Sequence, residues 1–165
     1  MTFLPFSETH WPAARAIYEE GIATGTATFT TEAPEWDEWH RSHLRHSRLV
    51  ATDAAGLVLG WAALSPVSGR CVYGGVAEVS VYVGAAARGR GVGRELLREL
   101  IDTSEQNGMW TLQASVFPGN EVSLRLHRAQ GFRIVGHRER IGQLRGRWQD
   151  TLLLERRSLI VGTAV

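Results

Sequence analysis

One segment of the 165-residue chain has residue types and spacing that are typical of anion binding. From Arg88 to Arg94, glycine occupies every second position, and an amphipathic pattern follows directly. Glycine lets the backbone turn tightly and approach a ligand closely, and the first turn of a helix presents unpaired N–H groups. Because the helix dipole also favours negative charge, the segment predicts a phosphate or pyrophosphate site with Arg88, Arg90 and Arg94 as charged donors.

Several explanations of this glycine-rich loop are open. A dinucleotide-binding turn needs Gly-x-Gly-x-x-Gly after the first strand, but here the glycines alternate in mid-chain. A Walker loop needs Gly-Lys-Ser/Thr, and the chain has no lysine, since all 18 basic residues are arginine. A plain turn before an ordinary helix is the structural alternative. The segment resembles most closely the acetyl-CoA loop of the GNAT acetyltransferases, Arg/Gln-x-x-Gly-x-Gly/Ala, which Arg88–Gly93 matches at every fixed position.

A carboxylate lies just before this loop, within the apolar, strand-like segment Val76–Val83. Acyl transfer to an amine requires that the amine first lose a proton, because an α-amino group is largely cationic at neutral pH. A carboxylate that faces the cleft can take this proton directly or through a water molecule. Glu78 is therefore the candidate base, with a surface or ion-paired glutamate as the structural alternative.

A second block, Phe117–Phe132, resembles the other GNAT signature, in which Asn and Ser begin a helix and a Gly-Phe pair follows it. Most GNAT enzymes have a tyrosine four residues before that glycine, where it can protonate the departing CoA thiolate. This chain has His127 there. Imidazole titrates near ~6.5, so His127 can complete deprotonation of the amine or protonate the thiolate. A histidine on the helix surface is the structural alternative.

These positions together resemble the phosphinothricin N-acetyltransferase family. The segment VAEVSVYV is similar to the corresponding segment of the bacterial branch of this family that acetylates methionine sulfoximine and methionine sulfone. The resemblance extends from Ile17 to about Leu154. Many members have a longer polar residue where this chain has Gly74–Gly75, which leaves the finer specificity open. The further matching positions are His127, Glu78, Phe29 with Thr31 and Glu32, and Arg70 with Tyr73.

The resemblance implies a role for each matching residue. Glu78 and His127 are the expected catalytic residues, and Phe29, Arg70 and Tyr73 are expected to bind the acceptor, with core packing as the alternative for Phe29. Acetyl-CoA is the expected co-substrate, and no metal is expected. The residues expected to bind acetyl-CoA are Val81, Tyr82, Val83, Arg88, Gly89, Arg90, Gly91, Val92, Gly93 and Asn120.

Composition fits an ordinary globular protein, with 44% hydrophobic and 21% charged residues. We expect a single domain over residues 1–165. The net charge of +1 gives no case for nucleic acid as a partner, and no apolar run approaches the ~20 residues of a membrane span. The start of the chain lacks the features of a signal peptide, and a lone Cys71 fits a reducing compartment, so a cytoplasmic location is expected.

The basic charge is concentrated near the end of the sequence. Residues 125–165 hold nine arginines and three acidic residues, so this segment has a charge of +6 in a chain of net charge +1. A solvated strand surface is the simpler explanation. The alternative is that some of these arginines meet an anionic ligand or a partner subunit.

The elements that must position these residues alternate along the chain. The pattern predicts an α/β (α+β) fold with a mixed sheet flanked by helices. The resemblance implies that this is the GNAT acyltransferase fold, with a central sheet of about six to seven strands and about four helices. The helix after the glycine-rich loop should bury Val92, Leu96, Leu97, Leu100 and Ile101. The predicted strands are 3–6, 48–52, 57–64, 76–83, 110–116 and one or two after residue 132, and the predicted helices are 11–20, 35–46, 92–106 and 120–130.

The sequence thus predicts an N-acetyltransferase for the α-amino group of a small amino-acid analogue, of a detoxifying or resistance type. Two alternatives stay open: a GNAT enzyme that acts on a protein or peptide N-terminus, and a non-catalytic acetyl-CoA sensor. A sensor would have no need for both Glu78 and His127. The resemblance also implies a homodimer, for which the region near Trp148 is a candidate surface.

Overall fold

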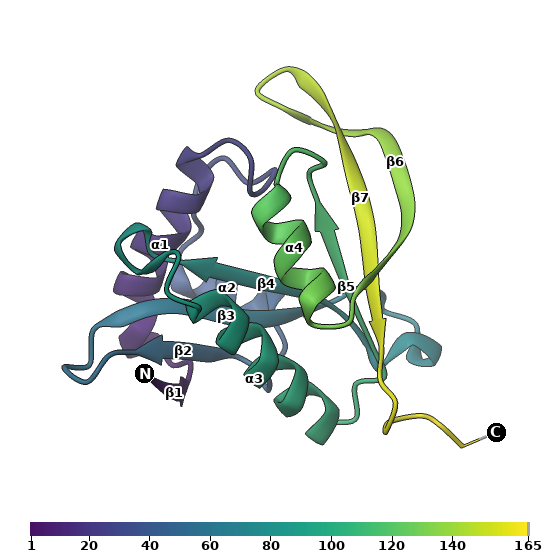
Figure 1. Ribbon diagram of the computed structural model, residues 1–165, viewed down its shortest axis with the longest axis horizontal. Helices are drawn as coiled ribbons and strands as arrows, with labels where there is room; N and C mark the ends of the chain where they lie inside the picture. The colour runs from purple at the N-terminus through teal and green to yellow at the C-terminus, as the bar shows by residue number, and fades with distance from the viewer. Residues whose placement is uncertain (165) are drawn as a thin grey trace.

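Seven strands form one mixed sheet in the computed structural model of the protein (Figure 1). Their order in space is β1-β2-β3-β4-β5-β7-β6, and every neighbouring pair is antiparallel except β4 with β5. The structure describes residues 1–164, so Val165, the last residue of the expected domain, lies outside the described residues. The strands are β1 (Thr2–Pro5), β2 (Leu49–Thr52), β3 (Val58–Pro66), β4 (Val76–Val83), β5 (Thr111–Val116), β6 (Arg133–Leu144) and β7 (Arg147–Arg157).

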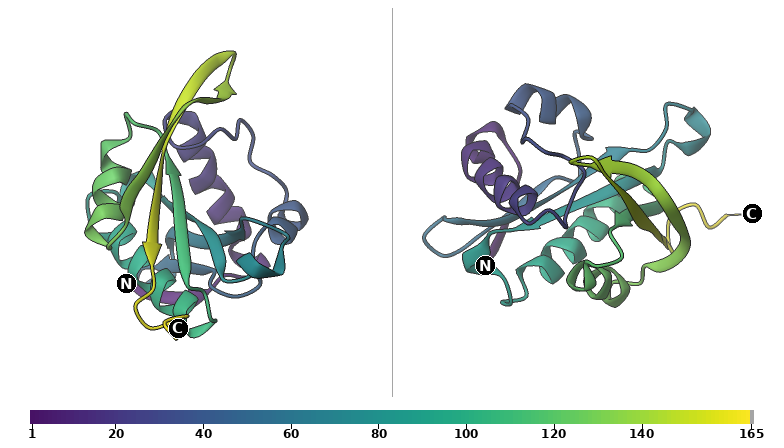
Figure 2. Two further views of the ribbon diagram at one scale, coloured as in Figure 1. Left: turned by 90° about the vertical axis from the view of Figure 1, so that its right-hand side faces the viewer. Right: turned by 90° about the horizontal axis from the view of Figure 1, so that it is seen from above.

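Four α-helices cover the two faces of the sheet. Helices α1 and α2 lie on one face, and α3 and α4 lie on the other (Figure 2). The expected α/β fold with about seven strands and four helices is therefore confirmed. None of the helices within residues 1–164 has the length and apolar character that crossing a membrane requires. The helices are α1 (Trp11–Ala23), α2 (Trp36–Ser42), α3 (Val92–Gln106) and α4 (Glu121–Ala129), and three single 3₁₀ turns are η1 (Glu8–His10), η2 (Cys71–Tyr73) and η3 (Ala85–Ala87).

Helix α3 packs through the apolar stripe that the sequence predicted. All five residues of the stripe are buried, and they contact Ala77 and Val79 of β4 within the main core cluster. The helix ends where the sequence predicted, at Asn107–Gly108, with Gly108 in the left-handed conformation that glycine readily adopts. The core under α3 thereby fixes the glycine-rich loop relative to β4.

The α1/α2 face of β2 and β3 is covered by a second, aromatic cluster. Trp39 of α2 and Trp61 of β3 pack against Phe6 and Trp11, and the Trp61 indole N–H donates to the Ala14 carbonyl oxygen at 3.0 Å. Tyr82 of β4 stacks on Trp61 with 4.8 Å between ring centroids. The cluster therefore extends from α1 and α2 as far as β4.

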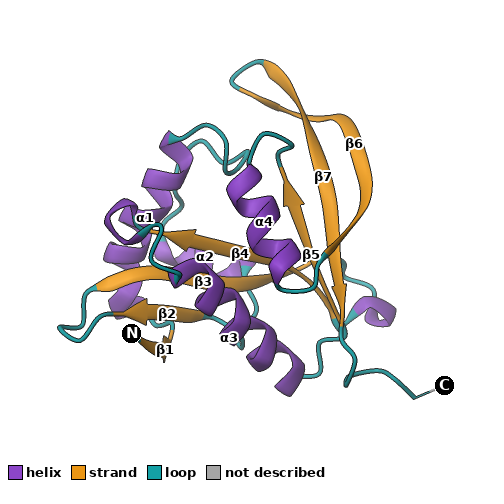
Figure 3. Ribbon diagram, in the orientation of Figure 1, coloured by secondary structure: helices purple, strands orange, loops and turns teal. Residues whose placement is uncertain are grey.

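Strands β4 and β5 separate after only three paired residues. Val76–Glu78 pair with Thr111–Gln113, and the remaining residues of β4 have no partner in β5 (Figure 3). On its other side β4 stays paired with β3 through seven residues, Ala77–Val83. The sheet is consequently open between the carboxyl ends of two adjacent parallel strands.

Helix α2 is shorter than the predicted 35–46, because it ends at Ser42. The Ser42 hydroxyl and Nδ1 of His43 both contact the Trp39 carbonyl oxygen, at 3.0 and 2.7 Å, in place of a further helical turn. The Leu44 N–H then donates to the Leu64 carbonyl oxygen at 2.8 Å. Side-chain bonding and pairing with β3 thus outcompete helix formation here.

Candidate active site

The glycine-rich loop has the backbone conformation that anion binding requires. Gly89 and Gly91 have φ of 73° and 79°, in the left-handed region, and Gly91 is the N-cap of α3. The N–H groups of residues 89–91 donate to no acceptor among the described residues. Together with the first N–H groups of α3, they form a set of free donors at the positive end of a helix.

Contacts to β4 place this loop at the mouth of the opened sheet. The Arg88 Nε donates to the Val83 carbonyl oxygen at 3.2 Å. A Cβ atom at Gly93 would lie 3.4 Å from Val83 Cγ2 and 3.6 Å from Leu126 Cδ2, so α3, β4 and α4 meet closely there. Arg94 pairs with Glu95, and Arg90 is exposed. The free donors therefore lie directly beyond the end of β4.

The outer half of β4 directs alternate backbone groups into the opening. Gly84 donates its N–H to Leu59 of β3, and the Tyr82 carbonyl oxygen faces Gly60 of the same strand. Backbone groups of adjacent strand residues point to opposite sides, so those of Val81 and Val83 face away from β3. Of the three residues expected to contact acetyl-CoA on this strand, two present backbone groups to the opening, and Tyr82 directs its own to β3.

Glu78 lies where β4 and β5 begin to separate. Its Oε2 accepts a hydrogen bond from Gln113 Nε2 at 3.0 Å and lies 3.5 Å from Ser115 Oγ. Its Oε1 has no hydrogen-bond partner among the described residues. The side chain is half-buried and faces the α1/α2 side of the sheet, because Glu78 pairs with Ser65 in the same alternation that places Trp61 opposite Tyr82. One carboxylate oxygen is thus fixed by β5 and the other is free.

His127 is buried in α4, with 5% of its surface exposed. Its Nδ1 lies 2.8 Å from the Ser123 carbonyl oxygen, and its ring packs edge-on against Phe132. Because a carbonyl oxygen only accepts, Nδ1 carries the proton and Nε2 has a free lone pair. Burial lowers the pKa of His127, and the bond to Ser123 opposes this shift. The imidazole is therefore neutral at neutral pH.

The structure does not bring Glu78 and His127 into direct contact. Glu78 faces the side of the sheet that carries α1 and α2, whereas His127 lies on α4, on the opposite side (Figure 2). The opening between β4 and β5 connects these two sides of the sheet. A reaction that used both residues would have to take place within that opening.

Asn120 caps α4 and also holds a neighbouring loop. Its Oδ1 accepts from the Ser123 N–H, and its Nδ2 donates to the Thr26 carbonyl oxygen, both at 3.2 Å. The side chain that was expected to bond the amide arm of the co-substrate is therefore engaged at both ends within the protein. This arrangement follows from local sequence, since Asn is a preferred N-cap residue.

The three expected acceptor residues lie in two places. Phe29 packs edge-on against Phe117 at 4.9 Å, and a Cβ atom at Gly142 of β6 would lie 3.0 Å from its ring. Arg70 and Tyr73 stand on the exposed connection between β3 and β4, where the guanidinium lies 5.6 Å from the tyrosine ring centroid. No hydrogen bond within residues 1–164 links either one to Glu78.

Trp110 explains the second glycine of the Gly74–Gly75 pair. A Cβ atom at Gly75 would lie 2.0 Å from the Trp110 ring, so no larger residue fits while this ring stays in place. The Gly75 carbonyl oxygen also accepts from the N–H groups of Trp110 and Thr111, at 2.8 and 3.1 Å. This glycine therefore fits the connection from η2 to β4 closely against the start of β5.

The polar partners of Glu78 are not among the site residues that the sequence predicted. Gln113 and Ser115 alternate along β5 with buried Leu112 and Ala114, and this period of two would have placed them on one face. Arg138 of β6 donates from Nη2 to Ser115 Oγ at 2.9 Å, which the excess of arginine near the end of the chain indicated only in general terms. The pairing of β5, β7 and β6 brings these residues together.

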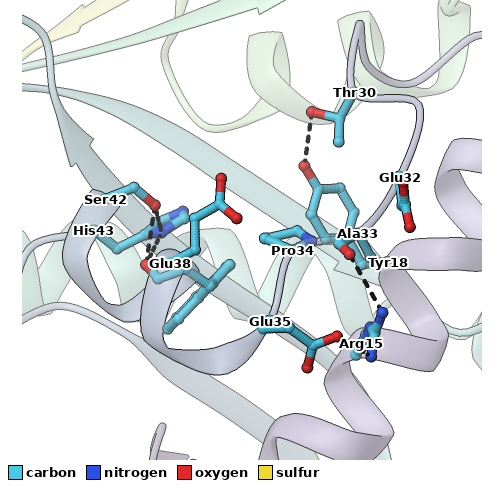
Figure 4. Close-up of a pocket in the computed structure, with 11 residues that line it drawn as sticks. Arg15, Tyr18, Thr30, Glu32, Ala33, Pro34, Glu35, Glu38, Ser42 and His43 are labelled. Carbon is cyan, nitrogen blue, oxygen red and sulfur yellow. Dashed lines mark hydrogen bonds and ion pairs between the residues drawn. The ribbon is translucent and has the colours of Figure 1, made fainter.

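A cleft of about 540 Å³ lies beside this region, between α1, α2 and the segment that joins them (Figure 4). The Tyr18 hydroxyl donates to Thr30 Oγ1 at 3.0 Å, and the Arg15 guanidinium pairs with Glu35 at 2.9 Å. Burial lowers the pKa of His43, at the far end of the cleft, to about 4. Among the described residues, no group of three or more His, Cys, Asp or Glu side chains is arranged to hold a metal ion.

Comparison with known sequences agrees with this geometry. Residues 11–132 match the family described as the Acetyltransferase (GNAT) family. The chain belongs to the GNAT acetyltransferase family. It is 35% identical over 152 residues to the L-methionine sulfoximine/L-methionine sulfone acetyltransferase of Pseudomonas aeruginosa, and the match covers 87% of each chain. The predicted family and enzyme class are therefore confirmed.

Comparison with solved structures gives the same fold. A GNAT superfamily phosphinothricin acetyltransferase from Sinorhizobium meliloti, solved in complex with acetyl-CoA, has a TM-score of 0.88 and 28% identity over 99% of this chain and 91% of that one. A ribosomal-protein-alanine N-acetyltransferase from Brucella melitensis has a TM-score of 0.87 and 32% identity over 96% of this chain and 100% of that one. The two structural relatives differ in the acceptor that their names give.

Proposed function

We propose that this GNAT acetyltransferase transfers the acetyl group of acetyl-CoA to the α-amino group of a small amino-acid analogue, of the phosphinothricin, methionine sulfoximine or methionine sulfone type. Such an activity would make these toxic analogues harmless. The observation that carries the proposal is the Glu78 carboxylate, which lies where β4 and β5 separate, with one oxygen held by β5 and the other free.

The described residues fit acetyl-CoA. The free N–H groups of the loop Arg88–Gly93 would bind its pyrophosphate, with Arg90 as a further charged donor. The backbone groups of Val81 and Val83 would bind the pantetheine arm in the manner of an added strand. Acetyl-CoA supplies an activated acetyl group as a thioester, and a Val81 or Val83 N–H would stabilise the negative charge that develops on the acetyl oxygen.

In this proposal Glu78 removes the proton from the acceptor amine. The free Oε1 takes the proton, directly or through a water molecule, while Gln113 holds Oε2 in place. His127 acts from the opposite side of the opening through Nε2. Its bond to Ser123 keeps the proton on Nδ1, so the Nε2 lone pair is free to accept a proton. Burial keeps the imidazole neutral before that step, and the bond to Ser123 stabilises the imidazolium that the step forms.

The acceptor is proposed to bind beside Glu78 on the α1/α2 side of the sheet. Phe29 would provide an apolar wall there, since it already packs against Phe117 and over Gly142. Arg70 and Tyr73 stay predictions from the resemblance, as the candidate groups for the acceptor's carboxylate or its sulfoximine or phosphinyl oxygens. Their exposure on the connection between β3 and β4 leaves the Arg70 guanidinium free to form such a contact.

A second candidate acceptor is a protein N-terminus, which is favoured by the 32% identity to the ribosomal-protein-alanine N-acetyltransferase. Both acceptors present a free α-amino group, so Glu78 would serve either one. They differ in what lies beyond that group: a free carboxylate in the amino acid and a peptide chain in the protein. Competition between the two kinds of acceptor therefore separates the candidates.

The test is release of CoA thiol from acetyl-CoA with methionine sulfoximine, methionine sulfone, phosphinothricin, an alanine-initiated peptide and spermidine. Wild type is compared with Glu78→Gln and His127→Ala. We expect turnover of the amino-acid analogues that falls by about 10²-fold or more in each variant. Acetyl-CoA binding without turnover of any analogue would reject the proposal. Turnover of the peptide alone would identify a protein N-terminus as the acceptor in place of an amino-acid analogue.

A homodimer is proposed from the same resemblance, and a cytoplasmic location is proposed from the lone Cys71, which fits a reducing compartment. The β6–β7 hairpin extends beyond the helices (Figure 1) and exposes Ile141 and Trp148, which are 52% and 59% accessible. A second copy of the chain would cover such apolar side chains. Light scattering after size-exclusion chromatography tests the dimer, with Trp148→Glu as the variant expected to dissociate it.

A further inference from the structure

Arg138 stands apart from the other basic side chains of β6. Arg133 pairs with Glu155, His137 with Asp150, and Arg140 with Glu139. Arg138 forms no ion pair within residues 1–164, although it is half-buried and its Nε is buried without a hydrogen-bond partner. Holding a guanidinium partly away from water without an opposing carboxylate costs free energy. Arg138 is therefore a candidate for a role outside simple surface pairing.

Its one hydrogen bond leads to the candidate base. Arg138 Nη2 donates to Ser115 Oγ at 2.9 Å, and Ser115 Oγ lies 3.5 Å from Glu78 Oε2. The Arg138 Nη2 and Glu78 Oε2 atoms are thus at most 6.4 Å apart. The pairing of β5 with β7 and of β7 with β6 produces this approach between residues 60 positions apart in the sequence. The other group bonded to Glu78, from Gln113, is neutral.

The chemistry of the three groups sets the direction of these bonds. A guanidinium has only donors, and an ionised carboxylate has only acceptors. The Ser115 hydroxyl must therefore accept from Arg138 and donate its own proton toward Glu78. A positive charge at the far end polarises the hydroxyl and strengthens this donation. Removing Arg138 would leave the hydroxyl free to rotate away from Oε2.

We propose that Arg138 is a positioning residue for Glu78, acting through Ser115. It fixes Oε2 against β5 and leaves Oε1 directed to the acceptor amine. This inference rests on the proposed function of Glu78, and it adds a residue from β6, three places away from β4 in the sheet.

The test compares Arg138→Met, Arg138→Lys and Ser115→Ala with Arg133→Met, a control on the same strand. Steady-state kinetics with acetyl-CoA and the best acceptor are measured from pH 5.5 to 9 on variants whose melting temperatures are recorded. We expect Arg138→Met to lower kcat by about 10-fold, with either KM changed less than about threefold. Arg138→Lys should restore part of kcat, and Arg133→Met should have the wild-type kcat.

The double variant Glu78→Gln/Arg138→Met separates the inference from the proposed function. We expect it to be no slower than Glu78→Gln alone, because Arg138 acts only through that carboxylate. A rise in acceptor KM with unchanged kcat in Arg138→Met would overturn the inference and assign Arg138 to acceptor binding. Full activity in Arg138→Met beside an inactive Glu78→Gln would overturn the inference alone. Full activity in Glu78→Gln would overturn the proposed function as well.

If Arg138→Met does not fold, the kcat values of Arg138→Lys and Ser115→Ala test the role of Arg138 instead. Lysine keeps the charge but has a single amine in place of the planar guanidinium, so it should lose part of kcat. Ser115→Ala removes the relay and should lose as much activity as the methionine variant was expected to lose. Wild-type kcat in both folded variants would contradict the role of Arg138.

Discussion

The α1/α2 side of the sheet consists of two unlike halves. Over β2 and β3, the side chains of Trp39, Trp61 and Val50 are at most 1% exposed within an aromatic cluster. Over β5 and β6 the same side carries Gln113, Ser115 and Arg138, which are polar and half-buried or exposed. The first half excludes water from a packed core. The second half leaves polar groups within reach of a ligand.

Strand β4 belongs to both halves, and the difference between them explains how it can leave β5. It pairs with β3 through seven residues but with β5 through only three. Tyr82 fixes its outer end to the aromatic cluster through Trp61. Because the packed half holds β4 in place, β4 can separate from β5 and still keep its position in the sheet. Stability and chemistry are therefore expected to respond to different substitutions.

The largest expected effect is a loss of stability after a substitution in the packed half. Trp61→Ala removes a fully buried indole and its hydrogen bond to the Ala14 carbonyl oxygen. We expect the free energy of unfolding to fall by about 3–5 kcal/mol, measured by urea denaturation. Leu159→Ala, at a site that is 85% exposed, is the control and should change stability by at most about 0.5 kcal/mol. Similar losses in the two variants would mean that the packed half does not carry the stability.

Gln113→Ala tests the open half, where we expect a substitution to lower activity and leave stability nearly unchanged. It removes the 3.0 Å hydrogen bond that holds Glu78 Oε2 in place, so the carboxylate loses the position that proton transfer requires. We expect kcat/KM to fall by roughly 10- to 100-fold, while the free energy of unfolding changes by less than about 1 kcal/mol. A loss of stability without a loss of activity would remove the functional distinction between the halves.

The elements of the molecule also differ in how far the sequence predicted them. The stripe of α3 follows from a helical period, and the glycine-rich loop follows from residue types within one short segment. Both depend on contacts close in sequence, so local pattern was enough. The shortened α2 was not predicted, because it depends on Leu44 pairing with Leu64 of β3, twenty residues away.

The site shows the same limit more clearly. Glu78 and His127 were expected from motif positions, and their roles stay predictions. Their placement on opposite sides of the sheet could not be predicted, because it depends on which face α4 packs against. Arg138 reaches Ser115 only through the order β5-β7-β6, which no local pattern specifies. Residues that act across strands distant in sequence need the fold before they can be found.

A smaller effect concerns the pH dependence of the packed half. Burial lowers the pKa of His43 to about 4, from 6.5 for an unperturbed histidine. Below pH 6.5 the unfolded chain binds a proton that the folded chain does not, so stability decreases as pH falls toward 4. At pH 5.5 this group accounts for about 1.4 kcal/mol, and below pH 4 for on the order of 3 kcal/mol.

His43→Asn isolates this contribution, because an asparagine amide can replace the Nδ1 donor to the Trp39 carbonyl oxygen without titrating. We expect the difference in unfolding free energy between pH 7.5 and 5.5 to be smaller in this variant than in wild type by about 1.4 kcal/mol. Equal pH dependence in the two proteins would show that folding does not lower the pKa of His43.

The smallest expected effect lies in the glycine-rich loop, outside both halves. Gly91 has φ of 79°, where an L side chain is strained by roughly 1–2 kcal/mol, although nothing lies within 4 Å of a Cβ atom added there. Gly91→Ala should therefore lower stability by about 1 kcal/mol and raise the KM for acetyl-CoA, with the KM for the acceptor unchanged. Gly119→Ala, also in open space but without positive φ, is the matched control. Because the strain acts only on backbone direction, a rise in acceptor KM in Gly91→Ala would show that the loop also shapes the acceptor side of the opening.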